Sequence, residues 1–590
     1  MWGVLCSHVH LQLQTVGVSE SNGYASAVLR FASAILGIAL TVAALPGQTP
    51  LPRAPAPDLV MFNGKVITVD RSFSTHEAVA IIGDRIMAVG NDDQMKTVAG
   101  SATRMIDLKG HAVIPGLMDN HLHGAGGGPG VDLSRARSLA DVNAAVQARV
   151  QASAPGDVIV SNSDWHEAQL EEQRLPLRDD LDRIAPQNPV VLVRGGHEYI
   201  LNSAALSRWG VTEATPEPAG GRITKYNNGR LNGELVDAAK SLVRLPPAAP
   251  RTPQQQLDNR IADYKKLNEA GLTSIRHPGL SIAEYRMLQE LQKRGQLTIR
   301  INALLRPAIG TSGVDPALAS SGIKQNEGDE QLRIGGIKLA VDGGFEGGLM
   351  RDLYEKPWDE NGTYRGLQTI DTERYITVVR NLNRQDWRVA THAVGDAAID
   401  LVLNAYEKAN AEQSIVDRRW SIEHAFIGRP DQLPRMKALG VAIAAQNHLF
   451  LAGPSLVKYW GPTRAAITTP VKMYLDAQLP VSSGTDAPVV PYPPLWTLYH
   501  FISRDTITGG VLGPDQRVTR QQALRMATIN NAWLNMEERT KGSIEPGKFA
   551  DLVILNEDPL TCPEPRLRDA KVLATLVGGK VVAGDLRMPQ

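Results

Sequence analysis

Eight short apolar runs alternate with amphipathic helical patterns through the body of this 590-residue chain. This alternation predicts an α/β protein whose main domain is a (β/α)8 TIM barrel. Two further observations support the prediction. Five of the runs lead directly into side chains that can bind metals, as in barrels whose active sites lie at the C-terminal ends of the strands. Strands at both ends of the chain fall outside the alternation, and we expect them to form a small β-sandwich.

The first 57 residues differ in composition from the rest of the chain. Residues 1–29 contain no Lys or Arg, and Arg30 precedes FASAILGIALTVAAL, an apolar run of 15 residues. A Pro-rich linker follows. The run is short for a membrane span but suits the core of a signal peptide. We therefore predict an exported protein, periplasmic or extracellular, with no stable membrane span in its mature form. A cytoplasmic protein with an irregular N-terminus is the alternative.

Alternating strands at residues 58–110 and 531–590 predict the two halves of the β-sandwich. The first half contains DLVMFNGKVITVD and AVAIIGDRIMAVG, in which apolar and polar residues alternate around Asn-Gly and Gly-Asp turns. The second half contains FADLVILNEDP and VLATLVGGKVVAG. Neither end has enough strands to bury a sheet alone, so we expect the two ends to pair.

Residues 111–530 hold the predicted barrel. About 150 residues separate its first and second strands, whereas an ordinary βα unit has roughly 30. That stretch has strand and turn patterns of its own, so we expect an inserted subdomain at about residues 155–245 that shapes the pocket over the barrel mouth. The predicted barrel strands are residues 112–118, 272–277, 297–304, 334–341, 387–392, 419–424, 440–446 and 480–485.

Charge and cysteine content exclude some classes of protein. Lys+Arg and Asp+Glu both number 62, and a neutral chain lacks the basic surplus of most nucleic-acid-binding proteins. We therefore expect no nucleic-acid partner. The two cysteines, Cys6 and Cys562, are too few for a disulfide framework or a Cys-x-x-Cys zinc site. A metal site in this chain must use nitrogen and oxygen ligands.

Four histidines and one aspartate are the candidate metal ligands. His121 and His123, in VIPGLMDNHLH, point to the same side of an extended strand and can bind one metal. His392 and His424 each follow a short strand. One such histidine alone is more often a core residue, but the order of all four along the strands favours ligands. Asp486, in PVSSGTDAP, would bind metal and accept a proton. A turn before the proline is the alternative for this residue.

Lys338 lies in an apolar strand, between Ile337 and Leu339. An unpaired ammonium is costly there, so the lysine either reaches the rim, pairs with Asp342, or is kept uncharged and reactive. A reactive amine can form a carbamate with carbon dioxide and bridge two metals. A lysine that forms a Schiff base is the third interpretation.

Four more histidines and a tryptophan are candidates for contact with a substrate. His197 lies in the insert and can reach a substrate carbonyl or leaving group. His448 follows the seventh predicted strand. Trp165, with His166 beside it, can line the mouth of the pocket from the insert. His277 ends the second predicted strand. It either lines the pocket or supports the residues that line it, and both roles stay open.

These segments resemble the metal-dependent amidohydrolase superfamily, in particular the family-3 branch that includes N-substituted formamide deformylases. The resemblance covers almost the whole chain from residue 58 onward. Its motifs are VIPGLMDNHLHG, RLPLRDDLD, PVVLVRGGHEYILNSAAL, IKLAVDGG, THAVGDAAID, SIEHA, GTDAPV and GSIEPGKFADLVIL. The chain departs from the family in SNSDWHEAQL, RGGHEYILN and DGGFEGGLMRD, which face the substrate, so specificity is the property in doubt.

The resemblance implies a binuclear centre of two divalent metal ions, usually zinc. His121 and His123 would bind one ion, His392 and His424 the other, and a carboxylated Lys338 would bridge them.

In the same family pattern Asp486 would bind the first ion, take a proton from the attacking hydroxide and deliver it to the leaving nitrogen. The implied activity is hydrolysis of a non-peptide C–N bond in a small amide-type substrate, with a homodimer as one expected assembly. Two alternatives stay open: a mononuclear deaminase on the same scaffold, and a non-catalytic member that binds ligands. Catalytic roles are expected for Asp486 and Lys338.

Overall fold

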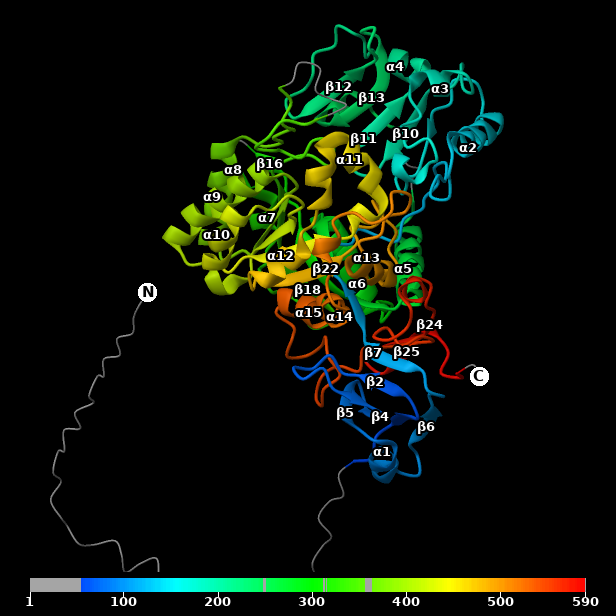
Figure 1. Ribbon diagram of the computed structural model, residues 1–590, viewed down its shortest axis with the longest axis vertical. Coiled ribbons are helices and arrows are strands. Elements are labelled where there is room, and N and C mark those ends of the chain that lie inside the picture. The colour runs from blue at the N-terminus through cyan, green and yellow to red at the C-terminus, as the bar shows by residue number, and fades with distance from the viewer. Residues whose placement is uncertain (1–54, 248–250, 311–312, 315, 356–362, 589–590) are drawn as a thin grey trace, which may run out of the picture. The chain divides into compact units, whose positions relative to one another are not determined.

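The computed structural model describes residues 55–247, 251–310, 313–314, 316–355 and 363–588 (Figure 1). The predicted leader at residues 1–57 lies almost wholly outside them. Among the residues so described, no helix has both the length and the apolar character that crossing a membrane requires.

An eight-stranded parallel sheet forms the barrel, which confirms the predicted fold class. Its strands follow chain order from one edge to the other, and the edges approach each other where the Asn120 N–H donates to the Ser483 carbonyl at 3.2 Å. Seven of the eight predicted strands agree with the structure to within a few residues. The strands are β8 (Leu117–Asp119), β14 (Leu272–Leu280), β15 (Arg300–Leu305), β18 (Leu332–Ala340), β19 (Val389–Ala393), β20 (Ser421–His424), β21 (Ala442–Gln446) and β22 (Val481–Gly484).

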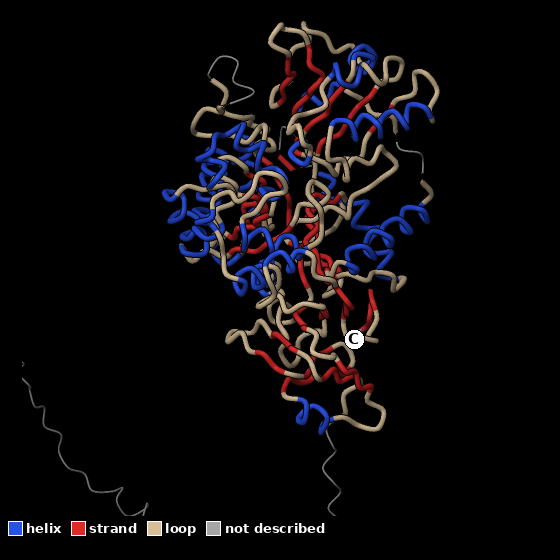
Figure 2. Tube along the Cα trace, turned by 45° about the vertical axis from the view of Figure 1, so that its right-hand side comes forward, coloured by secondary structure: helices blue, strands red, loops and turns tan. Residues whose placement is uncertain are grey.

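Helices surround the strands of the barrel (Figure 2). Local sequence fixes several of their starts: Thr252 and Ser281 each cap a helix, and Gln255 and Glu284 complete a capping box. Their apolar faces pack on the strands in one continuous core. The helices are α5 (Pro253–Glu269), α6 (Ile282–Lys293), α7 (Pro316–Ser320), α8 (Thr372–Arg384), α9 (Asp396–Glu412), α10 (Leu433–Ala438), α11 (His448–Ala466), α12 (Val471–Asp476), α13 (Pro494–Ser503), α14 (Arg520–Met526) and α15 (Ile529–Leu534).

The prediction that residues 112–118 form one barrel strand is wrong. The segment splits at Gly116 into β7 (Ala112–Pro115), which belongs to a terminal sheet, and β8, which belongs to the barrel. A Cβ at Gly116 would lie 2.1 Å from Thr273 Oγ1, so only glycine allows this close approach. The chain therefore changes partners there, because the Gly116 N–H donates to Asp551 and the Leu117 N–H to Gly271.

The two ends of the chain share a sheet. β7 pairs antiparallel with β23 (Leu552–Leu555), and apolar residues from both ends of the chain form one core. The boundary predicted between residues 530 and 531 cuts through α15, which contacts β8 and β22 of the barrel. The other terminal strands are β1 (Leu59–Phe62), β2 (Lys65–Ile67), β3 (Thr75–His76), β4 (Ala78–Ile82), β5 (Arg85–Gly90), β6 (Arg104–Asp107), β24 (Val572–Val577) and β25 (Lys580–Gly584), with helices α1 (Asp92–Val98) and α16 (Glu564–Arg568).

The insert between β8 and β14 is a mixed five-stranded sheet. It begins earlier than the predicted residue 155, because Val131 and helix α2 (Leu139–Gln151) share a core with β9 and β10. Its elements are β9 (Ile159–Val160), β10 (Val190–Arg194), β11 (Glu198–Leu201), β12 (Gly221–Lys225) and β13 (Leu231–Asp237), with α3 (Arg178–Asp182), α4 (Ser203–Arg208) and the short 3-10 helices η1 (Glu167–Gln169) and η2 (Ala238–Leu242).

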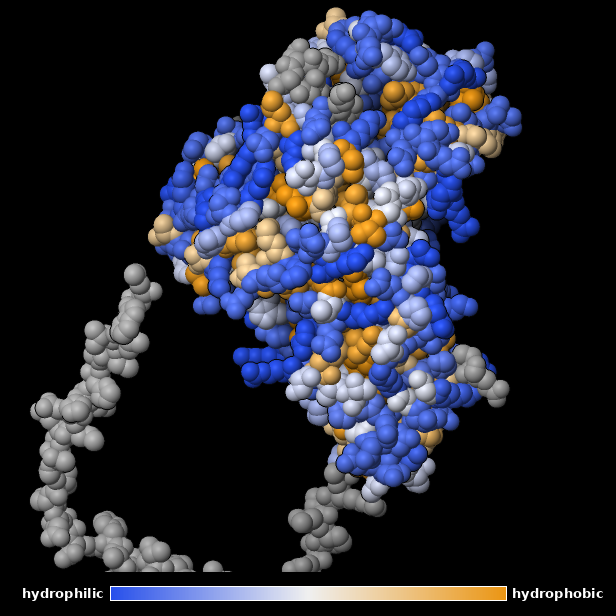
Figure 3. Space-filling model, in the orientation of Figure 1, coloured by the Kyte–Doolittle hydropathy of each residue, from blue (hydrophilic) through white to orange (hydrophobic). Residues whose placement is uncertain are grey.

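Figure 3 shows a largely hydrophilic face on which apolar residues form separate patches. The exposed large apolar side chains come from distant parts of the chain, among them Met105, Val416 and Val511. Scattered residues of this kind are ordinary on a protein surface.

Candidate metal centre

The six predicted ligands lie at or beyond the C-terminal ends of barrel strands. His121 and His123 follow β8, Lys338 and His392 lie near the ends of β18 and β19, His424 ends β20, and Asp486 follows β22. All six line one cavity of about 590 Å³. The same cavity is open to the insert, so the residues that could hold metal and those that could select a substrate meet in one place.

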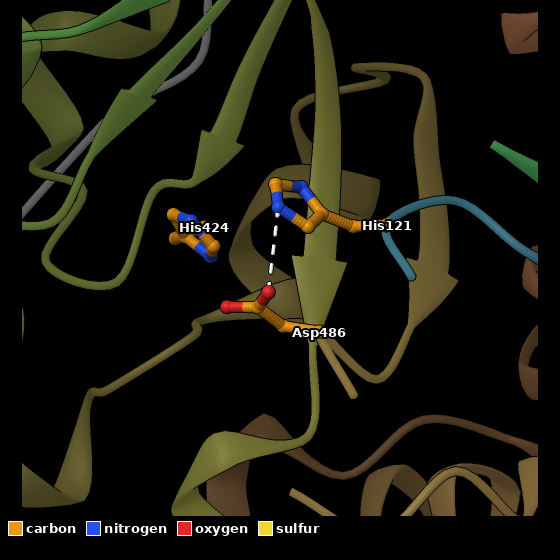
Figure 4. Close-up of side chains that lie close together, drawn as sticks. All are labelled: His121, His424 and Asp486. Carbon is orange, nitrogen blue, oxygen red and sulfur yellow. Dashed lines mark ion pairs between the residues drawn. The ribbon is translucent and has the colours of Figure 1, made fainter. Parts of the chain in front are cut away.

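Three of these side chains form the tightest group. One ligand atom each of His121, His424 and Asp486 lies within 4.8 Å of the others (Figure 4). His121 Nε2 is 3.4 Å and His123 Nε2 is 3.2 Å from the same oxygen, Asp486 Oδ1. Imidazole nitrogens and a carboxylate oxygen are a donor set that suits zinc and similar divalent ions.

The backbone is held in a left-handed conformation at two of the candidate ligands. φ is 72° at His424 and 62° at Asp486. Such values are costly for residues other than glycine and cluster at functional sites. The Asp486 N–H donates to the His121 carbonyl at 2.6 Å, which fixes the loop after β22 against the loop after β8.

Hydrogen bonds orient two of the imidazoles toward the centre. His121 donates from Nδ1 to Glu423 Oε2 at 2.6 Å, and His424 donates from Nδ1 to Gln446 Oε1 at 2.7 Å. Each Nε2 is therefore left with its lone pair, as required of a metal ligand. In its turn Glu423 accepts from Arg276 at 2.8 Å and from Ser421 Oγ at 2.6 Å.

Glu423, which orients the candidate ligand His121, was not identified from the sequence. Burial alone would favour its neutral form, but Arg276 and then the His121 hydrogen bond hold its pKa well below the usual value. Its charged form thus keeps the His121 ring in place. A carboxylate inside the short buried strand SIEH was the signal that could have revealed it.

Lys338 faces the centre. It is 5% exposed, which excludes the interpretation that it reaches the rim, and its Nζ lies 3.2 Å from His121 Nε2. Burial lowers the pKa of Lys338 to about 8. Asp342, its alternative partner, instead accepts backbone hydrogen bonds from Leu349, Val394 and Gly395.

His392 lies beside the tight group but outside it. Its Nε2 donates to the Gly343 carbonyl at 3.0 Å, and its ring centroid is 4.5 Å from that of His424. The Nδ1 atom is therefore the nitrogen that this side chain can offer to a metal. Burial holds the pKa of His392 well below its ordinary value, so the ring is neutral.

Two predicted substrate residues lie at the centre: His197 lines the cavity and the apolar recess beside it, and His448 lines the recess. His448 Nε2 lies 3.1 Å from Asp486 Oδ2, so this histidine contacts the candidate proton acceptor directly. His197 Nδ1 lies 2.6 Å from Asp237 Oδ1. Burial opposes the charged imidazolium, but the Asp237 carboxylate outweighs it and raises the pKa of His197.

The other candidates are held by their surroundings. Trp165 donates from Nε1 to the Val193 carbonyl at 2.7 Å and lines an apolar recess next to the cavity. His166 caps η1 by accepting from the Ala168 N–H at 3.0 Å. His277 is buried inside β14 rather than at its end, with its ring centroid 6.3 Å from that of His123.

A buried charge cluster joins the insert to the barrel. Arg194 of β10 donates two hydrogen bonds to Glu167, at 2.8 and 2.9 Å, and forms an ion pair with Glu346 of the loop after β18. Ser455 of α11 donates to the same Glu167 at 2.7 Å. Glu198 lies 3.3 Å from Arg194. This cluster of carboxylates around one guanidinium lies behind the apolar recess, which Arg194 and Glu346 help to line.

Comparison with known proteins identifies related chains over most of the length. The model of the amidohydrolase family matches residues 104–583. An N-substituted formamide deformylase of Arthrobacter pascens is 31% identical over 88% of this chain and 97% of its own length. Protein LONG AFTER FAR-RED 3 of Arabidopsis thaliana is 29% identical, over 94% of this chain and 98% of its own. An uncharacterised metal-dependent hydrolase of Pyrococcus horikoshii shares the fold, with a TM-score of 0.64 at 23% identity over 86% of this chain and 99% of its own.

Proposed function

The chain belongs to the amidohydrolase family, and we propose that this metal-dependent hydrolase of non-peptide C–N bonds cleaves small amides at a centre of two zinc ions. One observation carries the proposal: His121, His424 and Asp486 bring their ligand atoms within 4.8 Å of one another at the C-terminal end of the barrel. Lys338 and His123 lie within hydrogen-bonding distance of members of that group.

The side chains fit a pair of divalent ions. His121 and His123 would hold one ion together with Asp486, and His392 and His424 would hold the other. When bound, such ions lower the pKa of a water molecule and polarise the carbonyl of the substrate. The hydrogen bonds from the imidazoles to Glu423 and Gln446 support this assignment, because they leave nitrogen lone pairs free at the centre.

Lys338 is the proposed bridge between the two ions. A bond forms between its Nζ and the carbon of carbon dioxide, one proton leaves the nitrogen, and the product is a carbamate with two oxygen ligands. Two features support this step. The lysine is buried beside His121, and burial favours the neutral amine that reacts.

Asp486 and His197 would carry the proton transfers and the orientation of the substrate. The Asp486 carboxylate accepts a proton from the attacking water and returns it to the leaving nitrogen. His197 is held through Nδ1 by Asp237, which also raises its pKa, and in the charged form its Nε2 can donate a hydrogen bond to the substrate carbonyl. His448, in contact with Asp486, keeps that carboxylate in place.

A metal count combined with an amide panel tests the proposal. Purified protein should contain two divalent ions per chain, and intact mass after rapid quenching or crystallography should show the carbamate on Lys338. N-substituted formamides are the first amides to try, because the relative from Arthrobacter pascens is named for them. One ion with deamination of aminated rings, or ligand binding with no turnover of any amide, would contradict it and favour one of the two alternatives.

We also propose that the protein is exported, on the strength of the apolar run after Arg30. Sequencing the N-terminus of the mature protein from its native cells tests this. Cleavage after the apolar run is expected, and an uncleaved chain in the cytoplasm would contradict it.

A further inference from the structure

Two cations stand at the rim of the cavity, on opposite structural units. Arg306 directly follows β15 of the barrel, and Lys240 lies in η2 of the insert. Both line the same cavity as the six candidate ligands. Neither residue has a part in the proposed hydrolysis, so their positions call for a separate explanation.

Arg306 is exposed and free to bind a ligand. Among the described residues its guanidinium has no ion pair and no hydrogen bond, although arginine usually finds a carboxylate when one is near. It also lies close to the centre. A Cβ built on Gly279 would be 3.8 Å from Arg306 Cδ and 3.8 Å from His123 Cε1. Because residue 279 is a glycine, no side chain fills the space between them.

The acidic residues of the cavity are already engaged. Asp237 is bound to His197, Asp342 accepts backbone hydrogen bonds, and Asp486 belongs to the metal group. Among the described residues neither Arg306 nor Lys240 forms an ion pair, although the Asp237 carboxylate acts on Lys240 from a distance. Lys240 makes one side-chain hydrogen bond, to the Gly196 carbonyl, and burial lowers its pKa although the charges of Asp237 and Glu198 oppose that shift. Because both cations line the same cavity, they can act on one ligand.

An apolar recess adjoins the cavity at the centre. Phe345, Phe426, Val394 and Trp165 line a recess that shares His197, His424 and other residues with the cavity. The Phe345 and Phe426 rings are stacked, with centroids 5.3 Å apart. A substrate at the metal group would therefore have both the cations of the cavity and the aromatic rings of the recess within reach.

We propose that Arg306 and Lys240 bind an anionic group on the substrate, and that the amide cleaved by this protein carries a carboxylate or a similar anion together with an apolar group. This inference rests on the proposed function. Arg306 would bind the anion through its two-pronged guanidinium, and Lys240 would add a second charge from the insert. Both are specificity residues rather than catalytic ones.

A matched pair of substrates tests the proposal. N-formylphenylalanine and N-formyl-2-phenylethylamine differ only in the carboxylate. We expect the metal-loaded protein to hydrolyse the first with a kcat/KM at least about 10-fold higher, since one hydrogen bond to a charged group has that effect. Equal values, or a preference for the neutral amide, would overturn the proposal.

Variants at the rim assign the effect to residues. Arg306→Gln should lower kcat/KM for N-formylphenylalanine by about 10- to 100-fold and for the neutral amide by less than about 3-fold. Arg306→Lys should retain part of the preference, and Lys240→Met should add to the loss. The exposed Arg539 does not line the cavity, so Arg539→Gln is the matched control and should change neither value. An equal loss for both substrates in Arg306→Gln would overturn the proposal.

Binding without turnover separates this inference from the proposed function. N-methanesulfonylphenylalanine and N-methanesulfonyl-2-phenylethylamine are not hydrolysed, and calorimetry on the metal-loaded protein should show tighter binding of the first, lost in Arg306→Gln. If that preference is found while no amide is cleaved, the anion site stands and the proposed hydrolysis fails. If both formamides are cleaved equally and the sulfonamides bind equally, the hydrolysis stands and the anion site fails.

Discussion

The barrel side and the insert side of the cavity are built in opposite ways. On the barrel side, each candidate ligand lies at or near a strand end, and His121 and His424 are held by hydrogen bonds to Glu423 and Gln446 of other strands. On the insert side, His197, Asp237 and Lys240 line the cavity, and the insert is joined to the barrel by the buried ion pairs of Arg194 with Glu167 and Glu346. We infer from this difference that residues of the barrel carry out the reaction and residues of the insert determine which substrate binds.

The sharpest test of the barrel side is Asp486→Asn. Loss of the proton acceptor should reduce kcat by about 10³-fold or more. Circular dichroism and the melting temperature should stay close to those of the wild type. The exposed Asp515 is a matched control, and Asp515→Asn should keep full activity. Activity within 10-fold of the wild type in Asp486→Asn would show that the carboxylate is not part of the chemistry.

On the insert side, Arg194→Met should cause the largest loss of stability. Removing one partner of a buried charge pair costs about 3–5 kcal/mol, because Glu167 and Glu346 would be left without their cation. Urea unfolding at pH 8 measures the loss. The partly exposed Arg174, which pairs with Asp180, is the control, and Arg174→Met should cost less than about 1 kcal/mol. A similar small loss in Arg194→Met would mean that the cluster does not support the insert.

Glu423→Gln should weaken metal binding without unfolding the protein. Residues that orient a ligand typically change metal affinity by about 10- to 100-fold. Titration against a competing chelator measures this change. Glu407, an exposed residue paired with Arg435, is the control for the same substitution. Unchanged metal affinity in Glu423→Gln would show that His121 needs no orienting partner.

The smallest expected effect concerns pH and Glu198. Burial raises the pKa of Glu198 well above its ordinary value, and both of its oxygens lack a hydrogen-bond partner among the described residues. A folded pKa above the unfolded one gives stability that is present below pH 4.5 and is lost as pH rises through the folded pKa. Glu198→Gln should therefore stabilise the protein more at pH 8 than at pH 4.5. Urea unfolding at the two pH values checks this, and equal effects at both would contradict it.

The residues most readily predicted from the sequence were those that follow apolar strands. His121, Lys338, His424 and Asp486 each stand at the end of a recognisable run, and barrel topology then brings the runs together. The fold class followed from the same pattern. The split at Gly116 could not be predicted, because it depends on the close approach of Thr273 from another strand.

The sequence also could not predict which side chains pair across the barrel. Arg276 and Glu423 are separated by 147 residues, and no local pattern relates them. The same holds for Arg306 and Lys240. They line one cavity only because the insert covers the end of the third barrel strand. The start of the insert was placed too late because helix α2 resembles a barrel helix in sequence, whereas its apolar face packs on β9 and β10.

A high-resolution crystal structure of the metal-loaded protein tests the central claim most directly. The claim is that the barrel side holds two ions bridged by a modified Lys338. Two peaks of anomalous density should appear, one beside His121 and His123 and one beside His392 and His424, with a carbamate continuous with Lys338 Nζ between them. A single ion next to an unmodified lysine would contradict the binuclear centre.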